Sequence, residues 1–145
     1  MARDRQSVDE KDIKILEILR ENARASYAEI AREVGLSESA IRKRIASLIR
    51  RGIIRRFTID YSIANEIRAA VLIKVKPPAP VPVVSKNIIR QVRGVDRLYE
   101  ITGNYDILVI LRGSSIKDIN ESIDKIRNID GVADTNTLII LKSWP

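Results

Sequence analysis

The first third of the chain carries apolar residues at the spacing of an α-helix. One stripe recurs every three residues and consists of Ile13, Leu16 and Leu19. Ahead of it, Ser7 and Glu10 have the spacing of a capping box, in which a hydroxyl and a carboxylate satisfy free N–H groups at a helix start. We therefore expect a first helix that begins near Ser7 and ends at Asn22 and Ala23.

A second capping box, Ser26 with Glu29, opens a short helix. Its apolar residues are Ile30, Ala31 and Val34. Gly35 follows them and suits the left-handed conformation that ends many helices. The pattern predicts a short helix and then a tight turn at residues 34–37.

Ser37 can cap a third helix, which we expect to run to about Arg51, with Gly52 as its C-terminal stop. One face of this helix is apolar at positions i, i+4 and i+7 and consists of Ile41, Ile45 and Leu48. A short helix, a tight turn and a third helix together make the helix-turn-helix pattern.

Residues 53–63 alternate weakly between apolar and polar side chains and include β-branched and aromatic ones. We interpret them as a strand plus linker, with the hinge between the two halves at residues 61–67. The predicted domains are therefore 1–60, with three helices and the linker strand, and 61–145.

The second half has a different rhythm. Residues 68–76 read as an apolar strand, which the proline-rich turn 77–82 ends. Pro82 can occupy the first turn of a helix that runs to about Arg93.

Two strands come next, 95–101 and 106–112, joined as a hairpin through a short turn. Ser115 with Asp118 resembles a helix cap, and residues 131–141 supply a last strand. Between them lies a helix whose apolar stripe consists of Ile116, Ile119, Ile123 and Ile126. The order β-α-β-β-α-β predicts a ferredoxin-like arrangement with both helices on one face of an antiparallel sheet, so the whole chain is α+β.

Composition restricts the chemistry available to these 145 residues. Hydrophobic residues make up 45% and charged residues 31%, enough to bury a core in one compact domain or two small ones. Cysteine and histidine are absent, which excludes disulfides, thiolate nucleophiles, imidazole bases and the usual zinc sites. The start of the chain lacks the apolar region of a signal peptide and no apolar run is long enough to span a membrane, so we expect a soluble, cytoplasmic protein with no membrane partner.

Positive charge is concentrated in one segment. Residues 42–56 contain seven Lys and Arg and no acid, which equals the net charge of +7 for the whole chain. The rest of the chain therefore sums to zero. Such focusing is typical of a surface that binds anions.

The basic part of the third helix has two interpretations, a solvated face or a DNA-binding face. Three features favour DNA. The face has no acidic partners beyond Glu38. The short Ser and Ala side chains between the basic residues keep the helix narrow enough to enter a major groove. A capped helix and a turn also precede it. The candidate DNA-binding residues are Ser37, Ser39, Arg42, Lys43, Arg44, Ser47, Arg50 and Arg51. The cations would neutralise phosphates, and Ser39, Lys43 and Ser47 would address base edges.

The segment 99–110 holds a second candidate. Gly103 and Asn104 permit a turn that Asp106 ties by local hydrogen bonds, which is the simpler interpretation. Alternatively, N–H groups at the glycine turn would bind the carboxylate of an amino acid and Asp106 would balance its ammonium. Thr135 and Thr137 lie two apart and therefore on one face of the last strand, either as ligand-binding hydroxyls or as ordinary sheet residues.

Two rival function classes stay open. A sensor domain that acts on protein partners would need the second half but not the basic helix. An enzyme would need a nucleophile with its base, and no such set stands out. Glu121 and Asp124 are a pair of acids on a helix face that we expect to be exposed to solvent.

Three runs of residues resemble the leucine-responsive/AsnC-type (feast/famine) transcription regulators. They are 8–59, 92–111 with its TGNYD motif, and 131–141, so the resemblance covers nearly the whole chain. The proline-rich loop 77–82 departs from the family pattern.

The resemblance implies a transcription regulator that binds double-stranded DNA as a homodimer through a recognition helix at 37–51. In this family the C-terminal domain, often called the RAM domain, pairs its sheets into dimers that assemble further into tetramers or octamers. An amino-acid effector binds at contacts between dimers, and no other cofactor is implied. Carried over by motif, the ligand-binding residues are Gly103, Asn104, Tyr105, Asp106, Thr135 and Thr137.

Overall fold

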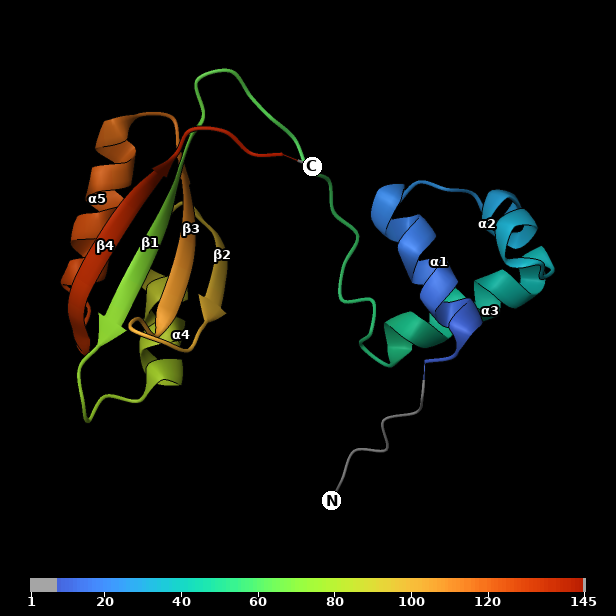
Figure 1. Cartoon of the computed structure of the whole chain (residues 1–145), viewed down its shortest axis with the longest axis horizontal. Coiled ribbons are helices and arrows are strands. Elements are labelled where there is room, and N and C mark those ends of the chain that lie inside the picture. Colours follow the sequence, from blue (N-terminus) through green and yellow to red (C-terminus); the bar gives the residue numbers. More distant parts are fainter. Residues whose placement is uncertain (1–7, 145) are drawn as a thin grey trace. The chain divides into compact units, whose positions relative to one another are not determined.

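The computed structural model describes residues 8–144, which form two compact units with the boundary between Tyr61 and Ser62. Each unit has its own cluster of buried apolar side chains. The first contains three helices, and the second contains a four-stranded sheet with two helices (Figure 1). None of the helices in the described part of the chain is long and apolar enough to cross a membrane.

The helices of the first unit are α1 (Glu10–Glu21), α2 (Tyr27–Val34) and α3 (Glu38–Arg50). They surround a core that consists of Ile15, Ile30, Ala31, Val34, Ile41, Ile45 and Leu48. The apolar faces predicted for α2 and α3 are therefore confirmed.

The ends of α2 and α3 follow from local chemistry. Ser26 and Glu29 form the predicted capping box, with Ser26 N–H donating to Glu29 Oε2 at 2.7 Å and Glu29 N–H donating to Ser26 Oγ at 3.2 Å. Gly35 ends α2 in the left-handed region at φ 72°, and Gly52 follows α3 at φ 71°. Ser37 caps α3, as its position predicts.

Two predictions for α1 are wrong. Asp9, not Ser7, is the N-cap, and its capping-box partner is Asp12; Ser7 itself lies outside the described residues. Ile15 is fully buried, whereas Ile13 is 47% exposed. Because α1 carries apolar residues at 13, 15, 16, 18 and 19, spacing alone does not select its inner face, and packing against α2 and α3 does.

The strand predicted at 53–63 is absent from the structure, in which no residue between 51 and 66 belongs to a strand. Ile53 and Ile54 instead pack against the core of the first unit. Beyond them the chain is exposed, and a strand needs a neighbour to pair its N–H and C=O groups. The described chain provides no such neighbour here.

The second unit consists of β1 (Ile67–Val75), α4 (Val81–Gln91), β2 (Val95–Glu100), β3 (Ile107–Gly113), α5 (Ile116–Arg127) and β4 (Val132–Ile140). The strands lie in the order β2-β3-β1-β4, and every neighbouring pair is antiparallel. This is the predicted βαββαβ fold, with β4 at one edge of the sheet.

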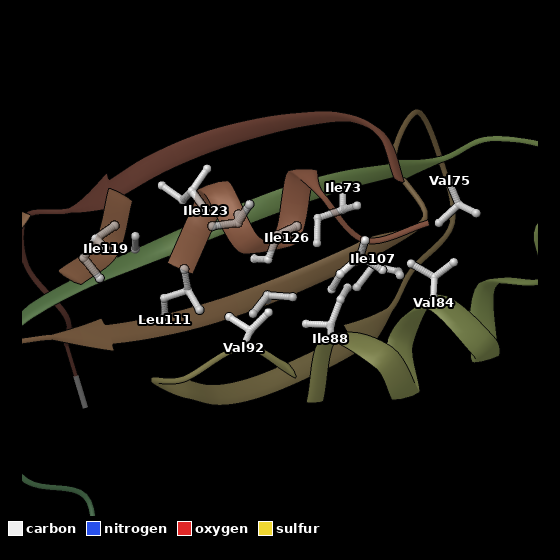
Figure 2. Packing of buried hydrophobic residues seen from close by; sticks show 14 residues of the cluster. Ile73, Val75, Val84, Ile88, Val92, Ile107, Leu111, Ile119, Ile123 and Ile126 are labelled. Atoms are coloured by element: carbon white, nitrogen blue, oxygen red, sulfur yellow. The ribbon is translucent and has the colours of Figure 1, made fainter. Parts of the chain in front are cut away.

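Strand alternation separates a covered face of the sheet from an open one. Ala69, Val71 and Ile73 of β1 are buried on the face that α4 and α5 cover. Ala70 and Leu72 alternate with them, so they lie on the opposite face, and they are only half-buried. Figure 2 shows side chains of both helices pointing into the core against β1 and β3.

The predicted stripe on α5 is confirmed at three of its four positions. Ile119, Ile123 and Ile126 are buried, but Ile116 is 51% exposed. Ile116 is the first residue of α5, after the N-cap Ser115, and it lines the open groove between α5 and β4.

Candidate DNA-binding helix and ligand groove

Helix α3 presents a polar, basic face to solvent because its apolar face is fixed on the core. Ile41 and Leu48 are fully buried and Ile45 is 5% exposed. Among the candidate DNA-binding residues, the exposed ones are Ser37, Ser39, Arg42, Lys43 and Arg50. The half-buried ones are Arg44, Ser47 and Arg51.

The serine at the start of α3 is already engaged. The Ser37 hydroxyl accepts the Ala40 N–H at 3.2 Å and lies 3.2 Å from the Ser39 hydroxyl. Ser37 therefore has a structural role as a cap, which leaves Ser39 as the serine of this pair that faces solvent without a capping role.

Arg42 is held against α2. Its guanidinium lies 4.8 Å from the centre of the Tyr27 ring, and Tyr27 is the first residue of α2. A cation over an aromatic face is attracted by the ring's quadrupole. This contact therefore restrains the exposed Arg42 side chain beside the N-terminus of α2. Tyr27 is not among the sequence-predicted site residues, because it lies far from Arg42 in the chain and only the packing of α2 against α3 brings the two together.

Arg44 is turned toward α1. Its Nη1 atom lies 2.7 Å from Asp9 Oδ2 and 2.8 Å from Asp12 Oδ1. From sequence alone, Arg44 is grouped with the DNA-binding cations, and neither aspartate is identified as its partner. Their i, i+3 spacing at a helix start is the one signal that pointed to them.

The TGNYD loop lies between β2 and β3. Gly103 and Asn104 are exposed, and Tyr105 and Asp106 are half-buried. The Asp106 carboxylate accepts the Val75 N–H at 2.8 Å and lies 3.3 Å from Lys74 Nζ. These bonds, the Val75 N–H first, lower the pKa of Asp106 below its ordinary value.

The two threonines lie on the covered face of the edge strand β4. Thr135 is opposite Ile73 and Thr137 is opposite Val71, both of which point into the core. Thr135 Oγ1 accepts a hydrogen bond from Arg127 Nε at 3.0 Å. The buried hydroxyl of Thr137 has no hydrogen-bond partner among the described residues.

Thr137 contributes to a groove of about 540 Å³ between α5 and β4. Its apolar lining consists of Ile116, Ile119, Ile123 and Ile139. Its polar lining comes from Asn120, Asp124 and Arg127 of α5, and the last two form an ion pair at 3.5 Å. Small-molecule sites have this volume and this mixture of apolar walls with a few polar groups.

The structure does not bring all six predicted ligand-binding residues into one pocket. Thr137 lines the groove, whereas Gly103 to Asp106 lie in the loop that precedes β3, on the other side of β1. Asn120 and Arg127 were missed because their role depends on how α5 packs beside β4. No group of acidic side chains within residues 8–144 is arranged to hold a metal ion.

A helix-turn-helix unit with a basic third helix, followed by an α+β unit that carries a groove, is typical of DNA-binding regulators with a separate ligand-binding domain. Comparison with known proteins gives the same division. Residues 8–49 match the AsnC-type helix-turn-helix domain, and residues 68–144 match the Lrp/AsnC ligand binding domain.

Individual relatives cover nearly the whole chain. It is 55% identical to the HTH-type transcriptional regulator LysM of Sulfurisphaera tokodaii over 94% of this chain and 97% of the relative. The solved structure of E. coli AsnC is 31% identical, covers 94% of each chain and superposes with a TM-score of 0.75. The feast or famine regulatory protein of M. tuberculosis complexed with L-methionine, at 24% identity, shares the fold, with a TM-score of 0.80 over 96% of this chain and 95% of that one.

The chain belongs to the Lrp/AsnC family of helix-turn-helix transcription regulators. It is a DNA-binding transcription regulator with a ligand-binding C-terminal domain, and it is not an enzyme. Glu121 and Asp124, the pair of acids considered for catalysis, lie on α5, where Asp124 lines the groove.

Proposed function

We propose that the chain binds a roughly palindromic DNA site as a homodimer, with α3 of each copy in the major groove of one half-site. The observation that supports this most is the placement of charge. Arg42, Lys43 and Arg50 are exposed on a helix whose opposite face is buried. Half-sites would lie about one helical turn apart, and the protein would act in the cytoplasm.

Within this interface, Lys43 and Arg50 project opposite the buried face of α3 at about 100° per residue, and Arg42 lies on the flank. Lys43 and the short Ser39 and Ser47 are the residues that we assign to base edges and adjacent phosphates. Arg42 and Arg50, with the half-buried Arg51, are assigned to phosphates.

The test is the affinity of Lys43→Ala for the best duplex that the parent protein selects from a random-sequence pool. We expect weaker binding and a salt dependence whose slope is reduced by about one. Lys117→Ala is the matched control, because Lys117 is an exposed helical lysine of the other unit. Unchanged affinity for Lys43→Ala would remove this interface. A protein that binds no duplex would instead favour the rival function, a sensor that acts on protein partners.

Two apolar surfaces support self-association. On the open face of the sheet, half-buried Ala70 and Leu72 adjoin Leu108 and Ile110 of β3, and Leu138 of β4 is 51% exposed. In the linker, four exposed apolar residues alternate at period two, namely Phe57, Ile59, Tyr61 and Ile63. Surfaces of this kind are usually covered by a partner, and we assign a second copy to each.

We further propose that the dimers assemble into tetramers or octamers. Sedimentation of the parent protein and of Leu138→Lys would test the dimer contact on the sheet. We expect Leu138→Lys to sediment as a smaller species. Ile89→Lys is the control, because Ile89 is an exposed isoleucine on α4. Equal sedimentation of Leu138→Lys and the parent would contradict the sheet as the dimer contact.

The proposed ligand is an amino acid. The groove offers the Arg127 guanidinium for a carboxylate, Asp124 for an ammonium, and the unpartnered Thr137 hydroxyl as a third polar group. The TGNYD loop lies apart from this groove in one chain. We therefore propose that the amino acid binds where copies meet, between the groove of one copy and the loop of another.

Thermal unfolding in the presence of each of the twenty amino acids tests this proposal. Methionine is the first candidate, because a protein of the same fold was solved with it. A ligand that binds the folded state raises the transition temperature, and Thr137→Val, which keeps the side-chain shape, should reduce the rise. No rise with any amino acid, for a protein that binds DNA, would exclude an amino-acid effector.

A further inference from the structure

Arg44 is the one residue of the basic run 42–44 whose charge is met inside the protein. A single nitrogen, Nη1, bridges Asp9 Oδ2 at 2.7 Å and Asp12 Oδ1 at 2.8 Å. These are the short distances of charge-assisted hydrogen bonds. Side-chain exposure is 31% for Arg44, 52% for Asp9 and 9% for Asp12, so the network extends from the surface into the protein.

Both carboxylates also hold the first turn of α1. Asp9 Oδ1 accepts the Asp12 N–H at 2.8 Å, and Asp12 Oδ2 faces the Asp9 N–H at 3.5 Å. Each aspartate thus uses one oxygen for the helix start and the other for Arg44. The same two side chains define where α1 begins and where α3 lies against it.

Burial makes this network sensitive to the loss of its cation. Asp12 is 6% exposed as a whole residue, and a buried carboxylate without a counter-charge is strongly destabilising. Hydrogen bonds to Asp9 and Asp12 raise the pKa of Arg44, and the Asp12 N–H and Arg44 lower the pKa of Asp9. These shifts have the direction that mutual stabilisation requires.

The two arginines on either side of Lys43 are directed to different helices. Arg42 lies over Tyr27 of α2, whereas Arg44 is bound to the start of α1. The carboxylates of Asp9 and Asp12 and the guanidinium of Arg44 together carry a net charge of about −1. A negative cluster disfavours contact with a phosphate group. The cations that remain for DNA lie on the Arg42 side and along the Lys43 face.

We propose that Arg44 is a positioning residue: by clamping α3 to Asp9 and Asp12 it sets the orientation at which the recognition helix enters DNA. It does not bind phosphate. The proposal rests on the function proposed above, in which the exposed face of α3 enters the major groove. Phosphate contact comes from Lys43 and from the arginines assigned to phosphates above, Arg42, Arg50 and Arg51.

The effect of Asp12→Asn on DNA affinity has opposite signs if Arg44 positions α3 and if charge alone determines binding. Removing a negative charge near DNA would by itself tighten binding, and it would release Arg44 toward a phosphate. If Arg44 positions α3, the same substitution loosens the clamp and weakens binding to the duplex selected by the parent protein. Tighter binding by Asp12→Asn than by the parent would overturn the proposal.

Salt dependence gives a second readout. Arg44→Ala is expected to lower affinity while leaving the slope of log affinity against log salt at the parent value, because no phosphate contact is lost. Lys43→Ala is expected to reduce that slope by about one. A reduction of about one for Arg44→Ala as well would overturn the proposal. Unchanged affinity for Lys43→Ala would instead contradict the DNA-facing assignment, whatever Arg44 does.

Milder variants keep the test decisive if Asp12→Asn or Arg44→Ala does not fold. Asp9→Asn alters the more exposed aspartate, and Arg44→Lys keeps a cation without the guanidinium fork. We expect both to fold, to bind the same duplex more weakly than the parent and to keep the parent's salt slope. Parent-level affinity in both variants would overturn the proposal.

Discussion

The Asp106 carboxylate satisfies a backbone N–H group at an irregularity in the sheet. The register between β1 and β4 shifts between Lys74 and Val75, and a bulge of this kind leaves backbone groups outside the regular ladder. The Asp106 carboxylate accepts the Val75 N–H there at 2.8 Å. This bond joins residues 31 positions apart, whereas the local hydrogen bond of the turn is made by the Asp106 backbone, whose carbonyl accepts the Ile101 N–H at 2.9 Å. The carboxylate is consequently engaged within its own chain.

This bond predicts an acid-sensitive contribution to stability. The folded pKa of Asp106 lies below its unfolded value, so the unfolded state binds more protons in acid. The contribution of Asp106 is therefore complete above about pH 5 and is lost as pH falls through about 3.9 and then through the folded pKa. Chemical denaturation between pH 7 and pH 3 should show a shallower loss for Asp106→Asn than for the parent. A loss of the same steepness would contradict this role.

Ile13 and Ile15 near the start of α1 are the same residue type, but only Ile15 is buried. Ile15 is 0% exposed and Ile13 is 47% exposed. Ile15→Ala should lower the free energy of unfolding of the first unit by about 2–5 kcal/mol, because it leaves a cavity. Ile13→Ala should change it by no more than about 0.5 kcal/mol. Urea denaturation followed by circular dichroism measures both, and equal effects would refute the assigned inner face of α1.

At the scale of elements, caps and turns determine where each helix and strand ends. The hydroxyls of Ser26, Ser37 and Ser115 each accept an N–H of the first helical turn. Replacing such a cap with alanine typically costs about 1 kcal/mol. The strand ends depend on non-local contacts instead. Gly94 precedes β2 at φ 74° and its backbone faces β3 closely, with its carbonyl accepting the Arg112 N–H at 2.8 Å.

Alanine substitutions at Gly94 and Gly103 distinguish the cost of backbone strain from the cost of a steric clash. Both Gly94 and Gly103 have positive φ, at 74° and 117°. A Cβ on Gly94 would lie 2.4 Å from the Arg112 carbonyl oxygen, whereas a Cβ on Gly103 would meet nothing within 4 Å. Gly103→Ala should cost roughly 1–2 kcal/mol from backbone strain alone, and Gly94→Ala should cost clearly more. Thermal unfolding would rank them, and the reverse order would contradict the close approach of β2 to β3.

At the scale of the whole molecule, the chain has two separate cores. One belongs to α1, α2 and α3, and the other, which Figure 2 shows, belongs to the sheet with α4 and α5. No residue belongs to both clusters of buried side chains. Units with their own cores unfold independently when few contacts join them.

Calorimetry should therefore resolve two unfolding transitions, and a core substitution should move only one of them. Ile30→Ala is expected to lower the transition of the first unit, because Ile30 is fully buried between α1, α2 and α3. Val109→Ala is expected to lower the other, since Val109 is fully buried in the sheet. A single transition that both substitutions lower equally would show that the units unfold together.

Local patterns were sufficient for most of the fold. Helical spacing, capping boxes and positions for glycine predicted α2 and α3 with their ends and the start of α5, and the alternation of strands and helices predicted βαββαβ. These signals arise from interactions between residues a few positions apart, which the sequence displays directly. The concentration of seven cations in 42–56 indicated DNA in the same way.

The remaining features depend on contacts between distant segments. The inner face of α1, the exposed Ile116 and the absent linker strand are set by what each element packs against. The sequence likewise places Arg44 beside Lys43, yet only the packed structure separates their roles, because Asp9 and Asp12 lie 35 and 32 residues away in the chain. The groove beside Thr137 has the same origin, since α5 and β4 form it together. Short-range chemistry determines the elements, and long-range packing determines which of their side chains remain available to bind DNA and ligand.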